Sequence, residues 1–193
     1  MKTYKNEVST AFEILLEEIE NVVEALNQEA ERIFKCQDYE KAKILIEDAS
    51  KITNFREKIK ELQQQWKDIF AAKASKEWHI SISKKKEKSH KKLKEGLRTP
   101  EDAYRIPILE SIIELGGEGK AQDVMDKVIE KMAKNLNEYD LAPLPLNPRI
   151  KRWKNTTRWC RYTLANEGLI DPNSERGVWV ITEKGRNYLK SNI

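Results

Sequence analysis

The stretch PRIKRWKNTTRWCRYTLANEGLI, residues 148–170, decides the fold of the second half of this chain. Asn147 and Pro148 are typical of a helix start and Gly168 of a helix end, so the pattern predicts a helix from about Pro148 to Glu167. Successive side chains of a helix are about 100° apart, which places small and apolar residues on one side. The residues expected to face a core are Trp153, Thr156, Cys160, Thr163 and Leu164, with Trp159 at the edge.

The other side of this predicted helix is basic. Residues 148–161 carry six Lys/Arg and no Asp/Glu. A charged helix face is usually only solvated, but this separation of charge favours nucleic-acid binding, because such side chains neutralise phosphates and an Arg or Asn also recognises base edges. The candidate DNA-binding residues are Arg149, Lys151, Arg152, Lys154, Asn155, Arg158 and Arg161, together with Arg176 at an expected wing tip.

Two helices are expected before the basic one. Thr99 followed by Pro100 predicts a helix start, with Thr99 as the cap, but Pro107 would break that helix and leaves a start at Pro107 open. Apolar residues at 3-4 spacing predict the next helix over residues 122–132. A proline-rich loop then leads to the basic helix.

Two short strands are expected after the basic helix, at residues 169–170 and 178–181, with turn residues between them. Thr182 is expected to cap a short closing helix. Three helices followed by a two-stranded wing is the winged helix-turn-helix arrangement, in which the third helix enters the major groove of DNA. The sequence therefore predicts a winged helix-turn-helix domain over residues 99–193.

Four motifs of this half also resemble a known family. RIPILESIIELGG, QDVMDKVIEKMA, RWCRYTLANEGLI and GVWVITEKGRNYL are similar to the amino-terminal winged-helix domain of Mrr-type restriction endonucleases. The resemblance covers about residues 99–190 and implies DNA binding. Members of that family carry a nuclease domain of the PD-(D/E)xK kind after this module, whereas this chain stops at Ile193, so no cleavage is expected. The matching residues are Trp159, Gly168, Leu169, Ile170, Gly177, Trp179, Ile181, Thr182 and Gly185.

The amino-terminal part shows a different pattern, that of two long amphipathic helices. An apolar stripe at 3-4 spacing runs from Phe12 to Ile33, and a second runs from Ala42 to Ile69. A polar break at residues 36–38 separates them, and Asp38 is a suitable cap for the second helix. We expect a coiled-coil-like helical hairpin over residues 1–72 that serves in oligomerisation or partner binding.

The charge of the chain is unevenly distributed. Residues 1–70 carry 11 Lys/Arg against 15 Asp/Glu, whereas residues 71–98 carry 10 against 3. The region 73–98 is therefore expected to be a basic linker. The fold class that results is mainly α: a helical hairpin, a linker, and a winged helix-turn-helix domain with a small β-wing.

Several other functional classes find no support in the sequence. No run approaches 18 apolar residues and the start lacks the core of a signal peptide, so we expect a cytoplasmic chain without membrane attachment. Cys36 and Cys160 indicate no disulfide framework, and the spacing of His79 and His90 is not that of a zinc site. We therefore expect no metal, no cofactor, no catalytic residue and no enzymatic activity.

Two functional hypotheses remain. In the first, the chain binds double-stranded DNA as a regulator or accessory of a restriction, defence or transcription system, and its hairpin forms a homo-oligomer, with a dimer favoured. In the second, it is an adaptor whose winged helix and hairpin dock a catalytic protein partner. Salt-dependent DNA binding distinguishes them.

Overall fold

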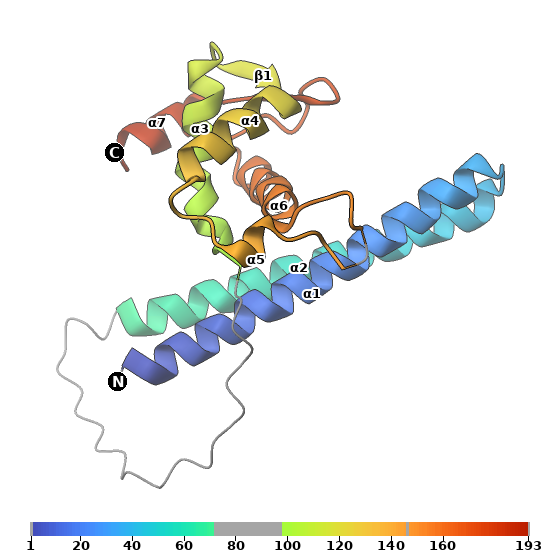
Figure 1. Cartoon of the computed structure of the whole chain (residues 1–193), viewed down its shortest axis with the longest axis horizontal. Coiled ribbons are helices and arrows are strands. Elements are labelled where there is room, and N and C mark those ends of the chain that lie inside the picture. The colour runs from blue at the N-terminus through green and yellow to red at the C-terminus, as the bar shows by residue number, and fades with distance from the viewer. Residues whose placement is uncertain (1, 72–97, 146, 193) are drawn as a thin grey trace, which may run out of the picture. The chain divides into compact units, whose positions relative to one another are not determined.

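The computed structural model describes residues 2–71, 98–145 and 147–192 (Figure 1). Its contacts divide the chain into two compact units, one built on the two long amino-terminal helices and one on residues 98–144 and 148–192. Apart from Arg98, the predicted basic linker lies outside the described residues. Within the described ranges, no helix combines the length and the apolar content that a membrane crossing requires.

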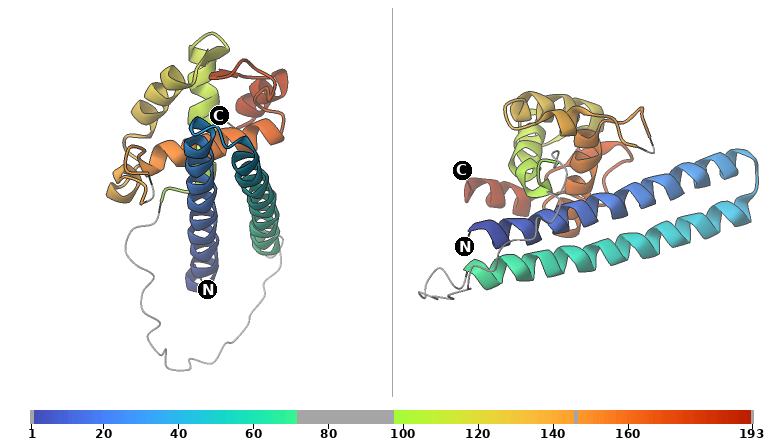
Figure 2. Two further views of the ribbon diagram at one scale, coloured as in Figure 1. Left: turned by 90° about the vertical axis from the view of Figure 1, so that its right-hand side faces the viewer. Right: turned by 60° about the horizontal axis from the view of Figure 1, so that its bottom comes forward.

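The first unit is an antiparallel pair of helices, α1 (Lys2–Lys35) and α2 (Tyr39–Ala71), which lie side by side (Figures 1 and 2). The turn between them places Gln37 at a positive φ of 64°. Asp38 Oδ1 accepts a hydrogen bond from the Lys41 backbone N–H at 3.2 Å. The predicted hairpin and its predicted cap are both confirmed.

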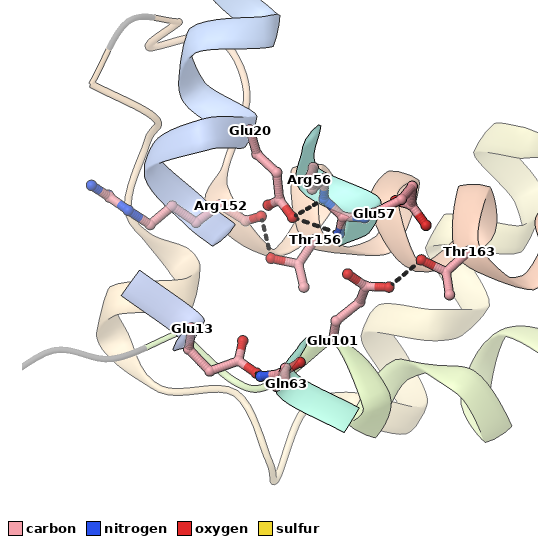
Figure 3. A network of polar contacts seen from close by, with 9 residues as sticks. All are labelled: Glu13, Glu20, Arg56, Glu57, Gln63, Glu101, Arg152, Thr156 and Thr163. Atoms are coloured by element: carbon pink, nitrogen blue, oxygen red, sulfur yellow. Dashed lines mark hydrogen bonds and ion pairs between the residues drawn. The ribbon is translucent and has the colours of Figure 1, made fainter. Parts of the chain in front are cut away.

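The interface between α1 and α2 combines an apolar cluster with buried polar contacts. Leu16, Ile19 and Ile59 form the cluster. Arg56 of α2 donates from Nε and Nη2 to Glu20 Oε1 of α1 at 2.8 and 2.7 Å, and neither side chain is exposed (Figure 3). Gln63 Nε2 donates to Glu13 Oε1 at 2.8 Å. Because buried polar groups require specific partners, these contacts fix the register of the pair.

The second unit is a small helical domain with a two-stranded antiparallel sheet. Its core is formed by apolar side chains of α3, α4, α6 and the wing, among them Ile108, Val128 and Trp179. The mainly helical class with a small β-wing is confirmed. The elements, in chain order, are a 3-10 helix η2 (Glu101–Tyr104), α3 (Arg105–Glu114), β1 (Glu118–Lys120), α4 (Ala121–Met132), α5 (Glu138–Leu141), α6 (Arg152–Asn166), β2 (Val178–Val180) and α7 (Glu183–Lys190).

The wing differs in part from the predicted hairpin. Ile170 and Ile181 do form an antiparallel bridge, as the strand pattern predicted. The regular ladder, however, joins β2 to β1, with Glu118 opposite Val180. The strand β1 was missed because its three residues, EGK, show neither alternation nor β-branched side chains.

The predicted cap at Thr99 is wrong. Thr99 donates instead to the buried carboxylate of Asp140, from its backbone N–H at 2.7 Å and from Oγ1 at 2.6 Å. Pro100 is the cap residue of η2, and no side chain caps that helix. The helix α3 then begins at Arg105. Pro107 therefore lies in its first turn, where a missing N–H leaves no hydrogen bond unmade.

The predicted start of the basic helix at Pro148 is also wrong, because α6 begins at Arg152. The preceding loop turns back on itself: the Leu144 N–H donates to the Ile150 carbonyl at 2.8 Å, and the Arg152 N–H donates to the Ala142 carbonyl at 3.0 Å. These bonds hold residues 148–151 in a non-helical conformation, so Asn147 caps nothing there. The short helix α5, which carries a capping box of Asn137 and Asp140, was not predicted.

Candidate nucleic-acid interface

The helix α6 is held in the domain by the face that the sequence predicted to be its core face. Thr163 Oγ1 donates to Glu101 Oε1 at 2.6 Å, which links α6 to η2 (Figure 3). Because this face packs against the domain, the rotation of α6 about its own axis is fixed, and with it the sides of the helix on which the other polar side chains lie. The predicted core residues are all buried: Trp153, Thr156, Cys160, Thr163 and Leu164.

A cleft of about 630 Å³ lies between α6, the start of α4 and the wing. Three arginines line it, Arg158 and Arg161 from α6 and Arg176 from the wing. Glu175 contributes one carboxylate, so positive charge dominates. The other lining residues are Ala121, Gln122, Met125, Pro172, Ser174, Gly177, Val178 and Trp179. An excess of guanidinium groups over carboxylates in a concave surface favours an anionic ligand.

Arg161, one of the residues that line this cleft, has a hydrogen-bond donor without a partner among the described residues. This donor is its Nε, which is buried. Burial lowers the pKa of its guanidinium, an effect that the nearby charge of Asp171 opposes. A partly desolvated guanidinium is stabilised by an anion that contacts its accessible atoms.

Two basic residues at the start of α6 contact the protein itself. Arg152 Nη1 donates to the Pro143 carbonyl at 2.7 Å, and its guanidinium lies 4.2 Å from the centre of the Tyr139 ring. The Lys154 ammonium lies 5.6 Å from the centre of the Trp153 ring. Arg152 thus closes the loop before α6.

The remaining predicted site residues are divided between the surface and the interior. Arg149 and Lys151 are exposed and precede α6. Asn155 is buried, with 4% of its surface exposed, so it is not among the exposed polar groups of the helix. The structure therefore brings Arg158, Arg161 and Arg176 together in one cleft, and it places the other five predicted residues elsewhere.

No pattern in the sequence indicated the far wall of this cleft. The pairing of β1 with β2 brings the start of α4 to the wing, and the Ala121 N–H donates to the Gly177 carbonyl at 2.8 Å. Gln122 and Met125 enter the cleft through this contact. Since β1 was not predictable, neither was the approach of α4 to the basic helix.

Comparison with known proteins supports the relationship that the motifs of this half indicated. No curated protein and no solved structure matches the chain. One family model does match, that of the Mrr N-terminal domain, over residues 102–191. The match extends from η2 through α7 and contains the three arginines of the cleft. Residues 102–191 of this chain are similar to the Mrr N-terminal domain.

Proposed function

We propose that the second unit binds double-stranded DNA, with the arginine cleft as the anchoring point for a backbone phosphate. The observation that carries this proposal is the convergence of Arg158, Arg161 and Arg176 on one concave surface. Guanidinium groups bind phosphate oxygens in a bidentate manner and stay charged at any physiological pH. Two of the three lie on the helix that enters the major groove in winged helix-turn-helix proteins.

In this proposal, the basic residues contact different parts of the DNA. Arg161, the most enclosed of the three, binds the phosphate at the base of the cleft, while Arg176 closes over it from the wing. Arg158 is exposed on α6, where an arginine reaches the edge of a guanine. Arg149 and Lys151 supply further phosphate contacts from the loop before the helix.

The similarity to the Mrr N-terminal domain supports a place in a restriction system. We propose that this chain supplies DNA binding there as an accessory or regulator and that a separate component performs any catalysis. The hairpin joins two copies of the chain in this proposal, so that two DNA-binding domains act on one duplex. Linked domains bind more tightly than single ones because the second contact becomes intramolecular.

Fluorescence anisotropy of a labelled random-sequence duplex tests the proposal with the full chain. Replacing Arg158 and Arg161 with alanine is expected to weaken binding at least tenfold at low salt, because each lost charged contact costs roughly 1 kcal/mol. Lys134→Ala and Lys190→Ala together form the matched control, since they remove the same charge from exposed sites outside the cleft. An equal loss in the control would reduce the effect to net charge, and an absence of binding by the wild type would favour the adaptor hypothesis.

A further inference from the structure

The hairpin carries two rows of exposed apolar side chains. On α1 the row contains Leu15 and Val22, which are 42% and 46% exposed. On α2 it contains Phe55, Leu62 and Ile69, which are 52%, 49% and 47% exposed. The members of each row are seven residues apart, which keeps them in line along a helix that packs against others with left-handed coiling.

Both rows lie on the same face of the hairpin. Four of the five members precede by one position a residue that is buried: on α1, Leu15 precedes Leu16 and Val22 precedes Val23, and on α2, Phe55 precedes Arg56 and Leu62 precedes Gln63. One step back along a helix is a rotation of about 100°. Because α1 and α2 are antiparallel and face each other, this rotation leads to the same face on both helices.

The two rows are also level with each other along the hairpin. The contact of Glu20 with Arg56 fixes the register of the two helices. It places Val22 level with Phe55 to within about one helical rise of ~1.5 Å. The same register places Leu15 level with Leu62. The hairpin therefore presents an apolar face on which Val22 lies level with Phe55 and Leu15 lies level with Leu62.

We infer that a second copy of the hairpin packs on this face and forms an antiparallel four-helix bundle. This inference rests on the proposed function, in which the hairpin joins two copies of the chain. The surface that joins them is the apolar face, and the arrangement is the bundle. With a twofold axis parallel to the helices, α1 of one copy covers α2 of the other at the same level. The row on α1 then meets the row on α2, and both copies bury the same residues.

The charges beside the rows support this occupant and this arrangement. Glu18 lies between Leu15 and Val22 on the outer edge of α1. Lys58 lies at the equivalent place on α2, between Phe55 and Leu62. Both are exposed and level with each other, and neither has a charged partner among the described residues.

Glu18 and Lys58 lie on opposite outer edges of one hairpin, so they do not meet within a chain. The twofold axis parallel to the helices places Glu18 of each copy beside Lys58 of the other, which forms two ion pairs for each dimer. An axis across the helices would instead place α1 against α1 and would lose both pairs. The charge pattern thus matches one arrangement of two identical copies.

Charge exchange tests this arrangement in sedimentation equilibrium of the full chain. Glu18→Lys and Lys58→Glu each replace two attractive contacts by two repulsive ones, so each variant alone is expected to dimerise about tenfold more weakly. An equimolar mixture of the two variants regains wild-type association, because the mixed dimer has both pairs matched. The control is Lys43→Glu, which changes the charge as Lys58→Glu does at an exposed site about 100° away from the row.

The apolar face is tested by Leu62→Glu, which is expected to leave helical circular dichroism unchanged and to abolish dimers at concentrations where the wild type is fully dimeric. A monomeric wild type would overturn the inference and favour a partner of another chemistry. Dimers that resist Leu62→Glu, or variants whose mixture does not associate, would also overturn it. Loss of DNA binding on replacement of Arg158 and Arg161 is a separate result, so the two proposals fail independently.

Discussion

Within the proposed DNA interface, Arg161 is the residue that we expect to contribute to binding rather than to stability. A buried donor without a partner lowers the stability of a fold by roughly 1–3 kcal/mol, and the Nε of Arg161 is such a donor. Trp153 Nε1 and the Tyr104 hydroxyl are also buried and have no partner in the described part of the chain, but neither carries a charge. A fold that retains a desolvated cation in a cleft gains most when an anion binds there.

We predict that Arg161→Met lowers the affinity for DNA without lowering the stability of the fold. Methionine replaces the apolar stem of the side chain as far as the position of Nε and removes both the unmet donor and the charge. The free energy of unfolding in urea is expected to stay the same or to rise by about 1 kcal/mol. DNA affinity, measured by anisotropy, is expected to fall. A variant that loses stability and still binds DNA normally would show that Arg161 is structural.

A second prediction at this scale concerns Gly185, in the first turn of α7. A Cβ at this position would lie 2.2 Å from the Leu169 carbonyl oxygen and 2.8 Å from Ile181 Cγ1. Gly185→Ala is therefore expected to lower the free energy of unfolding by about 3 kcal/mol, because the wing must move away from α7. Chemical denaturation followed by tryptophan fluorescence measures this loss.

Gly177 provides the control for Gly185. A Cβ there meets no atom within 4 Å, but the backbone has a φ of +85°. Gly177→Ala should cost only the conformational strain of about 1–2 kcal/mol. If Gly185→Ala cost no more than this, the close packing of α7 against the wing would not be important for stability.

At the scale of elements, the long helices could be predicted because their apolar residues recur at helical spacing over many turns. The same reasoning could not assign Arg56 and Gln63 to the helix interface, because both are polar and lie beside apolar residues that are exposed. The stripe read from the sequence contained Phe55 and Leu62, which the structure leaves exposed at about half of their surface. The periodicity of apolar residues shows which side of a helix is apolar. It does not show which part of that side is buried against the other helix and which part stays exposed.

The short elements were harder to predict for a different reason. The strand β1 is three residues long and forms through its ladder with β2. The helix α5 is four residues long, so its local capping box of Asn137 and Asp140 accompanies no apolar periodicity that a sequence pattern could show. The start of α6 depends on the bonds that the loop makes around Ile150 and Arg152. Of the site, the sequence therefore indicated the basic residues of one helix and of the wing tip, but not the cleft that three of them share.

The buried pair of Glu20 and Arg56 gives a prediction for the hairpin. Arg56→Met removes the guanidinium that contacts the buried Glu20 carboxylate and is expected to cost about 3 kcal/mol in urea denaturation followed by circular dichroism. Replacing both residues with methionine is expected to restore stability to within about 1 kcal/mol of the wild type. A double variant as unstable as the single one would show that the pair stabilises the hairpin beyond the cost of an unpaired charge.

At the scale of the whole molecule, the two units carry different kinds of surface. The acidic hairpin, with 11 Lys/Arg against 15 Asp/Glu in residues 1–70, is unsuited to a polyanion and suited to protein contacts. In the second unit, three arginines line one cleft and Arg149 and Lys151 are exposed on the loop before α6. In the proposed dimer, the hairpin joins two copies and two such clefts face one duplex, which we expect to raise the affinity without further contacts in either cleft.

The salt dependence of DNA binding tests the central claim most directly. The logarithm of the binding constant falls with the logarithm of salt concentration with a slope of about −0.9 for each phosphate neutralised. Anisotropy titrations of the full chain on a random duplex should therefore give a steep slope. Replacement of Arg158, Arg161 and Arg176 with alanine should flatten it by about 2–3 for each domain bound. An unchanged slope in this variant, or no binding by the wild type at low salt, would contradict DNA binding through the arginine cleft.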